Sequence, residues 1–213
     1  MRNFRTEGIV IKRRNFNEAD RILTVMTRDY GKIQIKAAGV RKITSRRSAH
    51  IELLNHTILH LYKGNTFSIL TEAKMLDDFS EIKENFDKVG LAYHVCELID
   101  GLCPENQENR NVYFLLQRTL QKLSQQDDVY LPQYESSEID DYTLGTYGLA
   151  VNDAPRRETR QNDLLQNFEY TLLSELGYWD RQSAIAQQFD THDMIEDILE
   201  RKLKSRTIFA KLQ

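Results

Sequence analysis

The sequence predicts an α+β protein in which a small β-barrel at the N-terminus is followed by an all-α domain. Hydrophobic residues alternate with a period of two through much of the first 75 residues, and from Ser80 they recur with the period of a helix. The charge changes at the same place: residues 1–75 hold 15 Lys and Arg against 6 Asp and Glu, and the remainder holds 14 against 26. We therefore place a basic barrel domain at residues 1–78 and an acidic helical domain at residues 79–213.

The barrel domain is predicted to contain short strands joined mainly by turns. They are expected at residues 8–11, 22–26, 32–37, 51–62 and 66–75. In the third strand Ile33 and Ile35 share one face and the lysines share the other, which is typical of a half-buried strand. Gly31, within "RDYGK", can take the positive φ of a tight hairpin turn. Strands this short and this close together favour a closed barrel of the OB type over an open sheet.

The helical domain begins with "ENFDKVGLAYHVCELIDGLC" (residues 84–103), which is too apolar for a surface helix and should lie inside a bundle. A second helix is expected in "NVYFLLQRTLQKL" (residues 111–123). Acids, prolines and glycines then mark an acidic insertion at about residues 127–160. Helical periodicity returns in "NDLLQNFEYTLLSELG", where Gly177 should cap the C-terminus, and again from Thr191 to the end.

Several classes of protein and site are disfavoured by the sequence. A stretch of roughly 18 apolar residues, as a membrane span requires, is lacking, so we expect a cytoplasmic protein. Phosphate-loop, zinc-protease, nucleophile-elbow and dinucleotide motifs are lacking too, and we predict that the protein is not an enzyme. Cys96 and Cys103 are not at ligand spacing and are expected to be buried thiols. The histidines form no convincing metal set in the sequence, so neither a metal nor another cofactor is expected.

The stretch "KAAGVRKITSRRSAH" (residues 36–50) is basic, and no carboxylate lies between Asp29 and Glu52 to neutralise it. It fills the one long gap between predicted strands, at a barrel mouth where OB proteins meet nucleic acid. The candidate DNA-binding residues are Lys36, Arg41, Lys42, Arg46 and Arg47, bordered by Lys12, Arg13, Arg14 and Lys32. The alternative is a solvated loop that is basic for solubility. Phe16 and Tyr30 either stack on unpaired bases or cap the barrel core.

A family resemblance supports the nucleic-acid interpretation. The run "EADRILTVMTRDYGKI" (residues 18–33), followed by "AAGVRK", "SRR" and a long hydrophobic strand, resembles the N-terminal domain of the RecO family of bacterial DNA repair proteins. The segments "LAYHVCELIDGLC", "FEYTLLSELGY" and "LKSRTIF" resemble parts of the family's helical domain. The resemblance implies a non-catalytic recombination mediator that binds single- and double-stranded DNA, anneals complementary strands and helps load RecA together with RecR.

The sequence departs from the family in two places. Many members carry a four-cysteine zinc site after "LGY", whereas this chain continues with "WDRQSAIAQQFDTHD", so we expect no zinc. The acidic insertion is also longer than the family usually shows.

The resemblance also implies that the helical domain binds the acidic, phenylalanine-ended tail of single-strand-binding protein. Such a tail needs an apolar pocket rimmed by cations, and the dense basic cluster of this domain consists of Arg201, Lys202, Lys204 and Arg206. The alternative is an ordinary amphipathic terminal helix whose charges face water. Two other functions stay open: an RNA-binding OB protein, because phosphate contacts do not distinguish RNA from DNA, and a protein-only adaptor.

Overall fold

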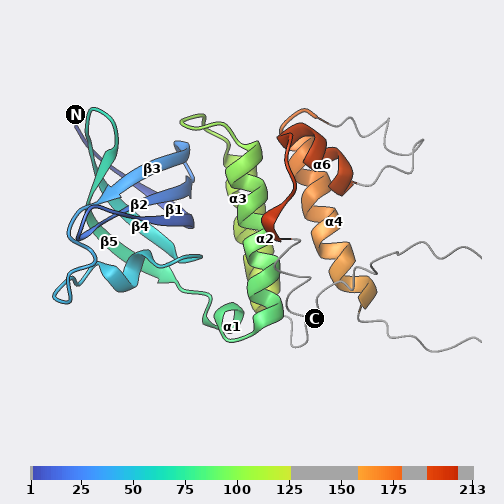
Figure 1. The fold of residues 1–213 in the computed structure, drawn as a ribbon, viewed down its shortest axis with the longest axis horizontal. Helices are drawn as coiled ribbons and strands as arrows, with labels where there is room; N and C mark the ends of the chain where they lie inside the picture. Colours follow the sequence, from blue (N-terminus) through green and yellow to red (C-terminus); the bar gives the residue numbers. More distant parts are fainter. Residues whose placement is uncertain (1, 126–157, 179–190, 206–213) are drawn as a thin grey trace, which may run out of the picture.

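The computed structural model describes residues 2–125, 158–178 and 191–205; within 158–178 the side chains are described from Leu164 onward. The described elements form successive layers (Figure 1): the barrel lies on one side, α2 and α3 form the middle layer, and α4 and α6 pack on the far side of them. The predicted class, an N-terminal OB-type barrel followed by helices, is confirmed. None of the described helices is both long enough and apolar enough to span a membrane.

The barrel closes in the order β1-β2-β3-β5-β4, with β3 and β5 paired in parallel and the other neighbours antiparallel. Its strands are β1 (Asn3–Phe16), β2 (Asp20–Thr27), β3 (Gly31–Ala37), β4 (His56–Lys63) and β5 (Ser68–Asp77). Side chains from alternate positions, among them Leu23, Val25, Ile35 and Leu59, fill the interior and are fully buried. A chain with period-two alternation thus buries one face of every strand inside the barrel.

Two predicted strand boundaries were wrong. β1 is much longer than residues 8–11 because its polar ends pair with β2 on one side and β4 on the other. The fourth strand begins at His56 instead of residue 51, because Ser48–Ile51 form a short 3₁₀ helix, η1, and Leu54 has a φ of 70°, outside the range of a strand. Ile51 fills the barrel core, whereas Leu54 packs with the helices.

The β2–β3 hairpin confirms the predicted turn at Gly31, whose φ is 66°. The Thr27 hydroxyl accepts a hydrogen bond from the Tyr30 amide at 3.1 Å and donates one to the Gly31 carbonyl at 2.7 Å. A Cβ on residue 31 would lie 1.7 Å from the carbonyl oxygen of Gln107 in the loop after α2. Residue 31 must therefore be glycine for two reasons: the turn needs a positive φ, and the hairpin lies in close contact with the loop after α2.

The helical part contains α1 (Ser80–Lys83), α2 (Phe86–Leu102), α3 (Arg110–Gln125), α4 (Glu158–Glu175) and α6 (Thr191–Leu199). Asn85 caps the N-terminus of α2, because its side chain accepts hydrogen bonds from the amides of Asp87 and Lys88. The expectation that α2 lies inside the domain is confirmed, since it is buried over most of its circumference. Cys96 and Cys103 are buried free thiols, as predicted. Nearly all of the acidic insertion predicted at residues 127–160 lies outside the described residues.

The helix ends follow the local sequence signals in one case and not in another. α4 ends in the predicted glycine cap: Gly177 has a φ of 79°, its amide donates to Ser174, and the Tyr178 amide donates to Leu173. The last predicted helix, expected from Thr191 to the end, is interrupted: α6 ends at Leu199, Glu200 has a φ of 52°, and residues 201–203 are irregular before helical structure resumes at Lys204. Arg201 and Lys202 therefore lie outside any helix, whereas Lys204 and Ser205 are helical, and the residues that follow them lie outside the described part of the chain.

The barrel and the helices share one apolar core. Ile9, Ile11 and Met26 of the barrel belong to the same buried cluster as the apolar residues of α2, α3, α4 and α6. A second, separate cluster fills the barrel interior. The inner face of the barrel wall packs the barrel core, and part of its outer face packs against the helices. This packing fixes the position of the loops at the barrel ends relative to α2.

Candidate nucleic-acid interface and partner pocket

The basic stretch forms an irregular loop between β3 and η1, here called the basic loop (residues 38–47). Gly39, with a φ of 68°, donates its amide to Asp20 at 2.8 Å, and the Arg41 amide donates to the Ala19 carbonyl at 2.9 Å. The hydrogen bond from Gly39, followed by that from Lys36, lowers the pKa of Asp20. These bonds attach the loop to the turn between β1 and β2, so its shape is set by the barrel.

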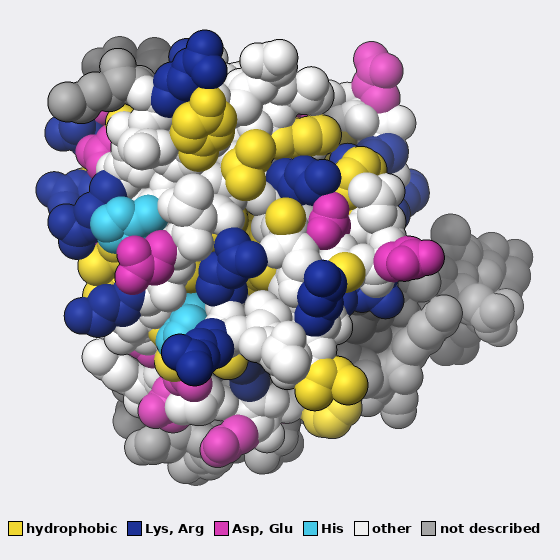
Figure 2. Space-filling view, turned by 90° about the vertical axis from the view of Figure 1, so that its left-hand side faces the viewer, with side chains coloured by type: hydrophobic (Ala, Val, Ile, Leu, Met, Phe, Trp, Pro, Cys, Tyr) yellow, Lys and Arg dark blue, Asp and Glu magenta, His cyan; other side chains and the backbone are white. Residues whose placement is uncertain are grey.

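Three cations of the basic loop and one on β1 are available to a ligand. Arg41, Lys42, Arg46 and Arg14 are exposed, and no ion pair within the described parts of the chain involves them. Ile43, at the tip of the loop, is 105% exposed. Figure 2 shows the barrel from the side facing away from the helices, with Lys and Arg side chains spread over it and gathered most densely along its left edge.

The other two predicted cations of this stretch support the fold. The Arg47 guanidinium donates to the backbone carbonyls of Leu70 at 2.7 Å and Ala38 at 2.8 Å, which anchors the loop to β5. The Lys36 ammonium lies 3.1 Å from a carboxylate oxygen of Asp20 and 5.4 Å from the centroid of the Phe16 ring. Arg47 is thus an anchor of the loop, and Lys36 is partly neutralised.

The three remaining predicted cations face carboxylates. Lys12 pairs with Asp100 of α2 at 2.5 Å, and Arg13 contacts Glu52. The alternation of residues in the third strand predicts that Lys32 faces solvent, and this prediction was wrong. Its side chain is 5% exposed and donates to the Asp100 backbone carbonyl at the junction with α2. The end of this strand face at Lys32, which would be exposed in an isolated barrel, is covered here by α2.

The two aromatic candidates lie at opposite ends of β3. Phe16 is beside the basic loop through its contact with Lys36. Tyr30 is in the hairpin at the start of β3, 42% exposed, with its ring edge-to-face with Phe4 at 4.8 Å. Tyr30 also lines a hollow of about 580 Å³ that contains Asp29 and Glu108. Of the pair, Phe16 is the one that could contribute to a ligand site at the loop.

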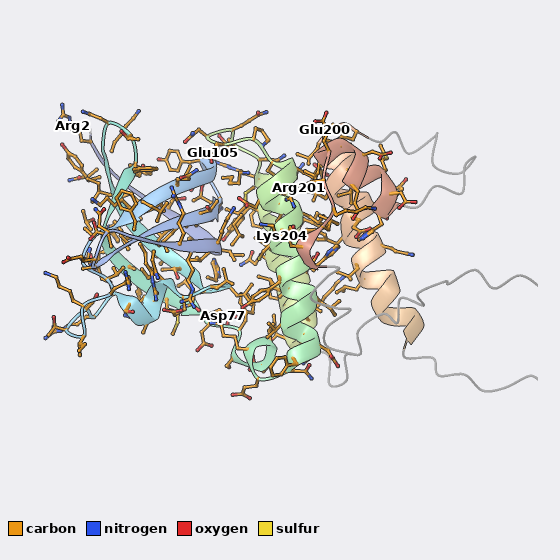
Figure 3. The ribbon with its side chains drawn as sticks, viewed as in Figure 1. Arg2, Asp77, Glu105, Glu200, Arg201 and Lys204 are labelled. Carbon is orange, nitrogen blue, oxygen red and sulfur yellow. The ribbon has the colours of Figure 1, made fainter. Side chains whose placement is uncertain are left out.

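A second candidate site, here called the terminal pocket, lies between β1, α2 and the segment after α6. It has a volume of about 230 Å³. Its lining consists of Ile11, Lys12, Tyr93, Cys96, Glu97, Asp100, Arg201, Lys204 and Ser205. Figure 3 labels Arg201 and Lys204 on the terminal segment beside α2. The pocket combines an apolar wall with cations at its rim. Lys202 points elsewhere and pairs with Glu196 at 2.8 Å, and Arg206 lies outside the described residues.

Glu97 holds the terminal segment in place. Its carboxylate accepts hydrogen bonds from the Lys204 amide at 2.9 Å, the Ser205 amide at 2.8 Å and the Arg201 guanidinium at 2.8 Å. Burial alone would raise the pKa of Glu97, but the hydrogen bonds from Arg201, Lys204 and Ser205 outweigh it and lower the pKa to about 2. The carboxylate is therefore ionised at neutral pH and fixes the backbone that carries Lys204.

Two family models match the chain: residues 1–79 match "Recombination protein O N terminal" and residues 83–140 match "Recombination protein O C terminal". The chain belongs to the RecO family. The protein named DNA repair protein RecO from Roseiflexus sp. (strain RS-1) is 38% identical over 153 residues, which are 72% of this chain and 50% of that protein. The protein of the same name from Symbiobacterium thermophilum is 33% identical over 117 residues, 55% of this chain and 46% of the relative.

A third RecO protein, from Listeria welshimeri, is 35% identical over 127 residues, 60% of this chain and 49% of the relative. The chain spans about half the length of the curated RecO relatives it matches. Both matched regions agree with the described architecture, because the N-terminal match covers the barrel and the C-terminal match begins just before α2.

Sequence reasoning missed two residues of these sites. Ile43 stands between basic residues in "RKITSRR", and an apolar residue in a polar loop was the signal that could have singled it out. Glu97 gave no such signal, because its partners are more than a hundred residues away in the sequence.

Proposed function

We propose that this RecO-family chain is a recombination mediator in DNA repair that binds single- and double-stranded DNA through the basic loop. On this proposal it anneals complementary strands, helps load RecA together with RecR, and acts at the nucleoid without catalysing a reaction. Membership of the family and the names of the relatives support a role in DNA repair. The contacts of the loop support its role in binding, since they leave Arg41, Lys42 and Arg46 exposed on a loop held by the barrel.

The chemistry of the loop fits the phosphate backbone better than particular bases. Flexible cations without carboxylate partners replace condensed counterions on DNA, and this gives affinity that does not depend on sequence. Ile43 adds an apolar tip between these cations. Isoleucine is one of the side chains that proteins insert between base steps, so we place Ile43 against unstacked bases while its neighbours hold the phosphates.

The test compares two double variants that each remove one Lys and one Arg. Lys42→Ala/Arg46→Ala changes the basic loop, and Arg118→Ala/Lys122→Ala changes exposed positions on α3. The loop variant should bind single strands more weakly, and the salt dependence of its log K should flatten by about 1.4, from about 0.7 per phosphate contact. The α3 variant should bind as wild type does. Equal affinities of the loop variant and wild type at low salt would refute the interface.

Competition and annealing separate mediator, RNA-binding and adaptor functions. Unlabelled single-stranded DNA, duplex DNA and structured RNA compete for the loop, and preferential competition by RNA would favour the RNA-binding alternative. Lack of binding to any nucleic acid would favour a protein-only adaptor. A mediator should accelerate annealing of complementary strands coated with cognate single-strand-binding protein, and an unchanged annealing rate would overturn that part of the proposal.

We further propose that the terminal pocket binds the acidic, phenylalanine-ended tail of single-strand-binding protein. The pocket supplies an apolar wall and three rim cations, of which Lys12 pairs with Asp100 and Arg201 with Glu97, so Lys204 is the rim cation that we expect to contact the tail. Lys204→Ala should weaken binding of a tail peptide at least tenfold, a loss of about 1.4 kcal/mol. Lys202→Ala is the matched control, because Lys202 does not line the pocket. Calorimetry that finds equal peptide affinity in the two variants would exclude this pocket.

A further inference from the structure

Three helices bring two imidazoles and a carboxylate together inside the helical domain. His94 comes from α2, Glu169 from α4 and His192 from α6. The His94 Nε2 and His192 Nδ1 atoms lie 2.8 Å and 3.5 Å from the same oxygen, Oε1 of Glu169. The two rings are nearly parallel, with centroids 5.6 Å apart. All three residues are buried, with exposures of 1%, 4% and 8%.

We propose that His94, Glu169 and His192 bind a divalent transition-metal ion, with zinc as the best match. Imidazole nitrogen and carboxylate oxygen are zinc ligands with bonds of about 2.0–2.2 Å, which place two ligands of a tetrahedral ion roughly 3.3 Å apart. The two nitrogen–oxygen separations, 2.8 Å and 3.5 Å, lie on either side of that value. One donor atom from each residue lies within 4.8 Å of the others, so small side-chain rotations suffice to surround an ion.

The surroundings of the three side chains match those of metal ligands. The Nδ1 atom of His94 lies 2.8 Å from the hydroxyl of Ser205. In this structure Nε2 of His94 faces a Glu169 carboxylate oxygen at 2.8 Å and donates its proton to it; a bound ion would take the place of that proton, while Nδ1 keeps its own proton and donates to Ser205. The second oxygen of Glu169 accepts a hydrogen bond from Thr191 at 2.6 Å. Outer partners of this kind hold metal-binding imidazoles and carboxylates in place.

The ligand types indicate which ions fit. Mg²⁺ and Ca²⁺ prefer sites made of oxygen atoms, whereas imidazole with carboxylate suits zinc and other first-row transition ions. This conclusion differs from the sequence-based expectation of no metal. That expectation depended on the spacing of the cysteines and on the spread of the histidines along the sequence, which do not show that residues 75 and 23 positions apart meet in the fold. A bound ion would tie α2, α4 and α6 together, as a structural zinc site does.

Zinc titration of the chelator-treated 213-residue chain tests the proposal. We expect one zinc ion per chain, a higher unfolding temperature with zinc than without it, and no such shift with Mg²⁺. Co²⁺ should bind in place of zinc and give the visible absorption of a low-coordinate site. Glu169→Gln, which keeps the size of the side chain, should weaken zinc binding by about 100-fold or more, because even loss of an outer partner costs about 10–100-fold.

Two further variants make the test decisive even if a ligand variant fails to fold. Ser205→Ala keeps all three ligands and should weaken zinc binding about tenfold through loss of the outer partner. His60→Ala removes a histidine of β4, in the barrel, and should leave zinc affinity unchanged. Absence of zinc binding by folded wild-type protein, or equal zinc affinity in wild type, Glu169→Gln and Ser205→Ala, would overturn the proposal.

Discussion

Replacing Glu97 with glutamine should destabilise the protein in a way that depends on pH. The carboxylate accepts hydrogen bonds from Arg201, Lys204 and Ser205, and its pKa is lowered from 4.5 to about 2. A difference of that size corresponds to about 3 kcal/mol at about 1.4 kcal/mol per pKa unit. Because the side chain is still 14% exposed, we expect Glu97→Gln to lower the free energy of unfolding by about 2 kcal/mol at neutral pH.

The direction of the pH effect follows from the lowered pKa. A carboxylate with a lower pKa in the folded state than in the unfolded state stabilises the fold fully above its ordinary pKa, here 4.5. That stability is lost as the pH falls from 4.5 toward about 2. Glutamine does not titrate, so the difference between wild type and Glu97→Gln should be constant from neutral pH to about pH 5 and should shrink below it.

Urea unfolding followed by circular dichroism measures this difference at a series of pH values. Glu84→Gln is the matched control, because Glu84 is an exposed glutamate of the same domain. It should change the free energy of unfolding by less than about 0.5 kcal/mol at neutral pH. The reasoning fails if the deficit of Glu97→Gln is the same at about pH 3 as at neutral pH, since the deficit would then come from packing and not from the charge.

Four other substitutions, of which Gly39→Ala is a control, test local contacts of the fold by thermal or urea unfolding. Gly31→Ala should lower the free energy of unfolding by roughly 3 kcal/mol or more, because the new Cβ would clash with the Gln107 carbonyl. Gly39 also has a positive φ but has open space around it, so Gly39→Ala should lower the free energy of unfolding by only about 1 kcal/mol. Equal losses in the two variants would contradict the clash. Arg47→Ala should lower the free energy of unfolding by about 2 kcal/mol, because the hydrogen bonds to two backbone carbonyls are lost. A loss below about 0.5 kcal/mol would show that Arg47 does not anchor the loop. Asn85→Ala should lower the free energy of unfolding by about 1 kcal/mol, because the N-terminal cap of α2 is lost. An unchanged unfolding midpoint would contradict the capping role of Asn85.

The barrel could be predicted from the sequence because its signals are local. The period-two alternation of β3 and the glycine turn before it involve neighbouring residues. The start of the fourth strand was misread because Ile51 and Leu54 are both apolar, yet they pack into two different cores. Apolarity shows that a residue is buried, but only the tertiary structure shows against which element.

The roles of individual cations could not be predicted for the same reason. Arg46 and Arg47 are neighbours in the sequence, but one is exposed and the other reaches two backbone carbonyls, including that of Leu70. Lys32 and Lys36 lie on the same face of β3, but α2 covers only the first. A basic stretch predicts a positively charged surface, and its division into binding residues and anchors depends on partners distant in the sequence.

The two proposed binding sites are connected through β1. Lys12 lines the terminal pocket, and Arg14 is exposed two residues further along the same strand. Two residues of a strand span about 7 Å, which is less than the Debye length of about 8 Å at physiological ionic strength. An acidic peptide beside Lys12 would therefore reduce the positive potential at Arg14, where the proposed DNA surface begins. The two ligands would weaken each other's binding through charge repulsion, most strongly at low salt, although each contacts its own set of residues.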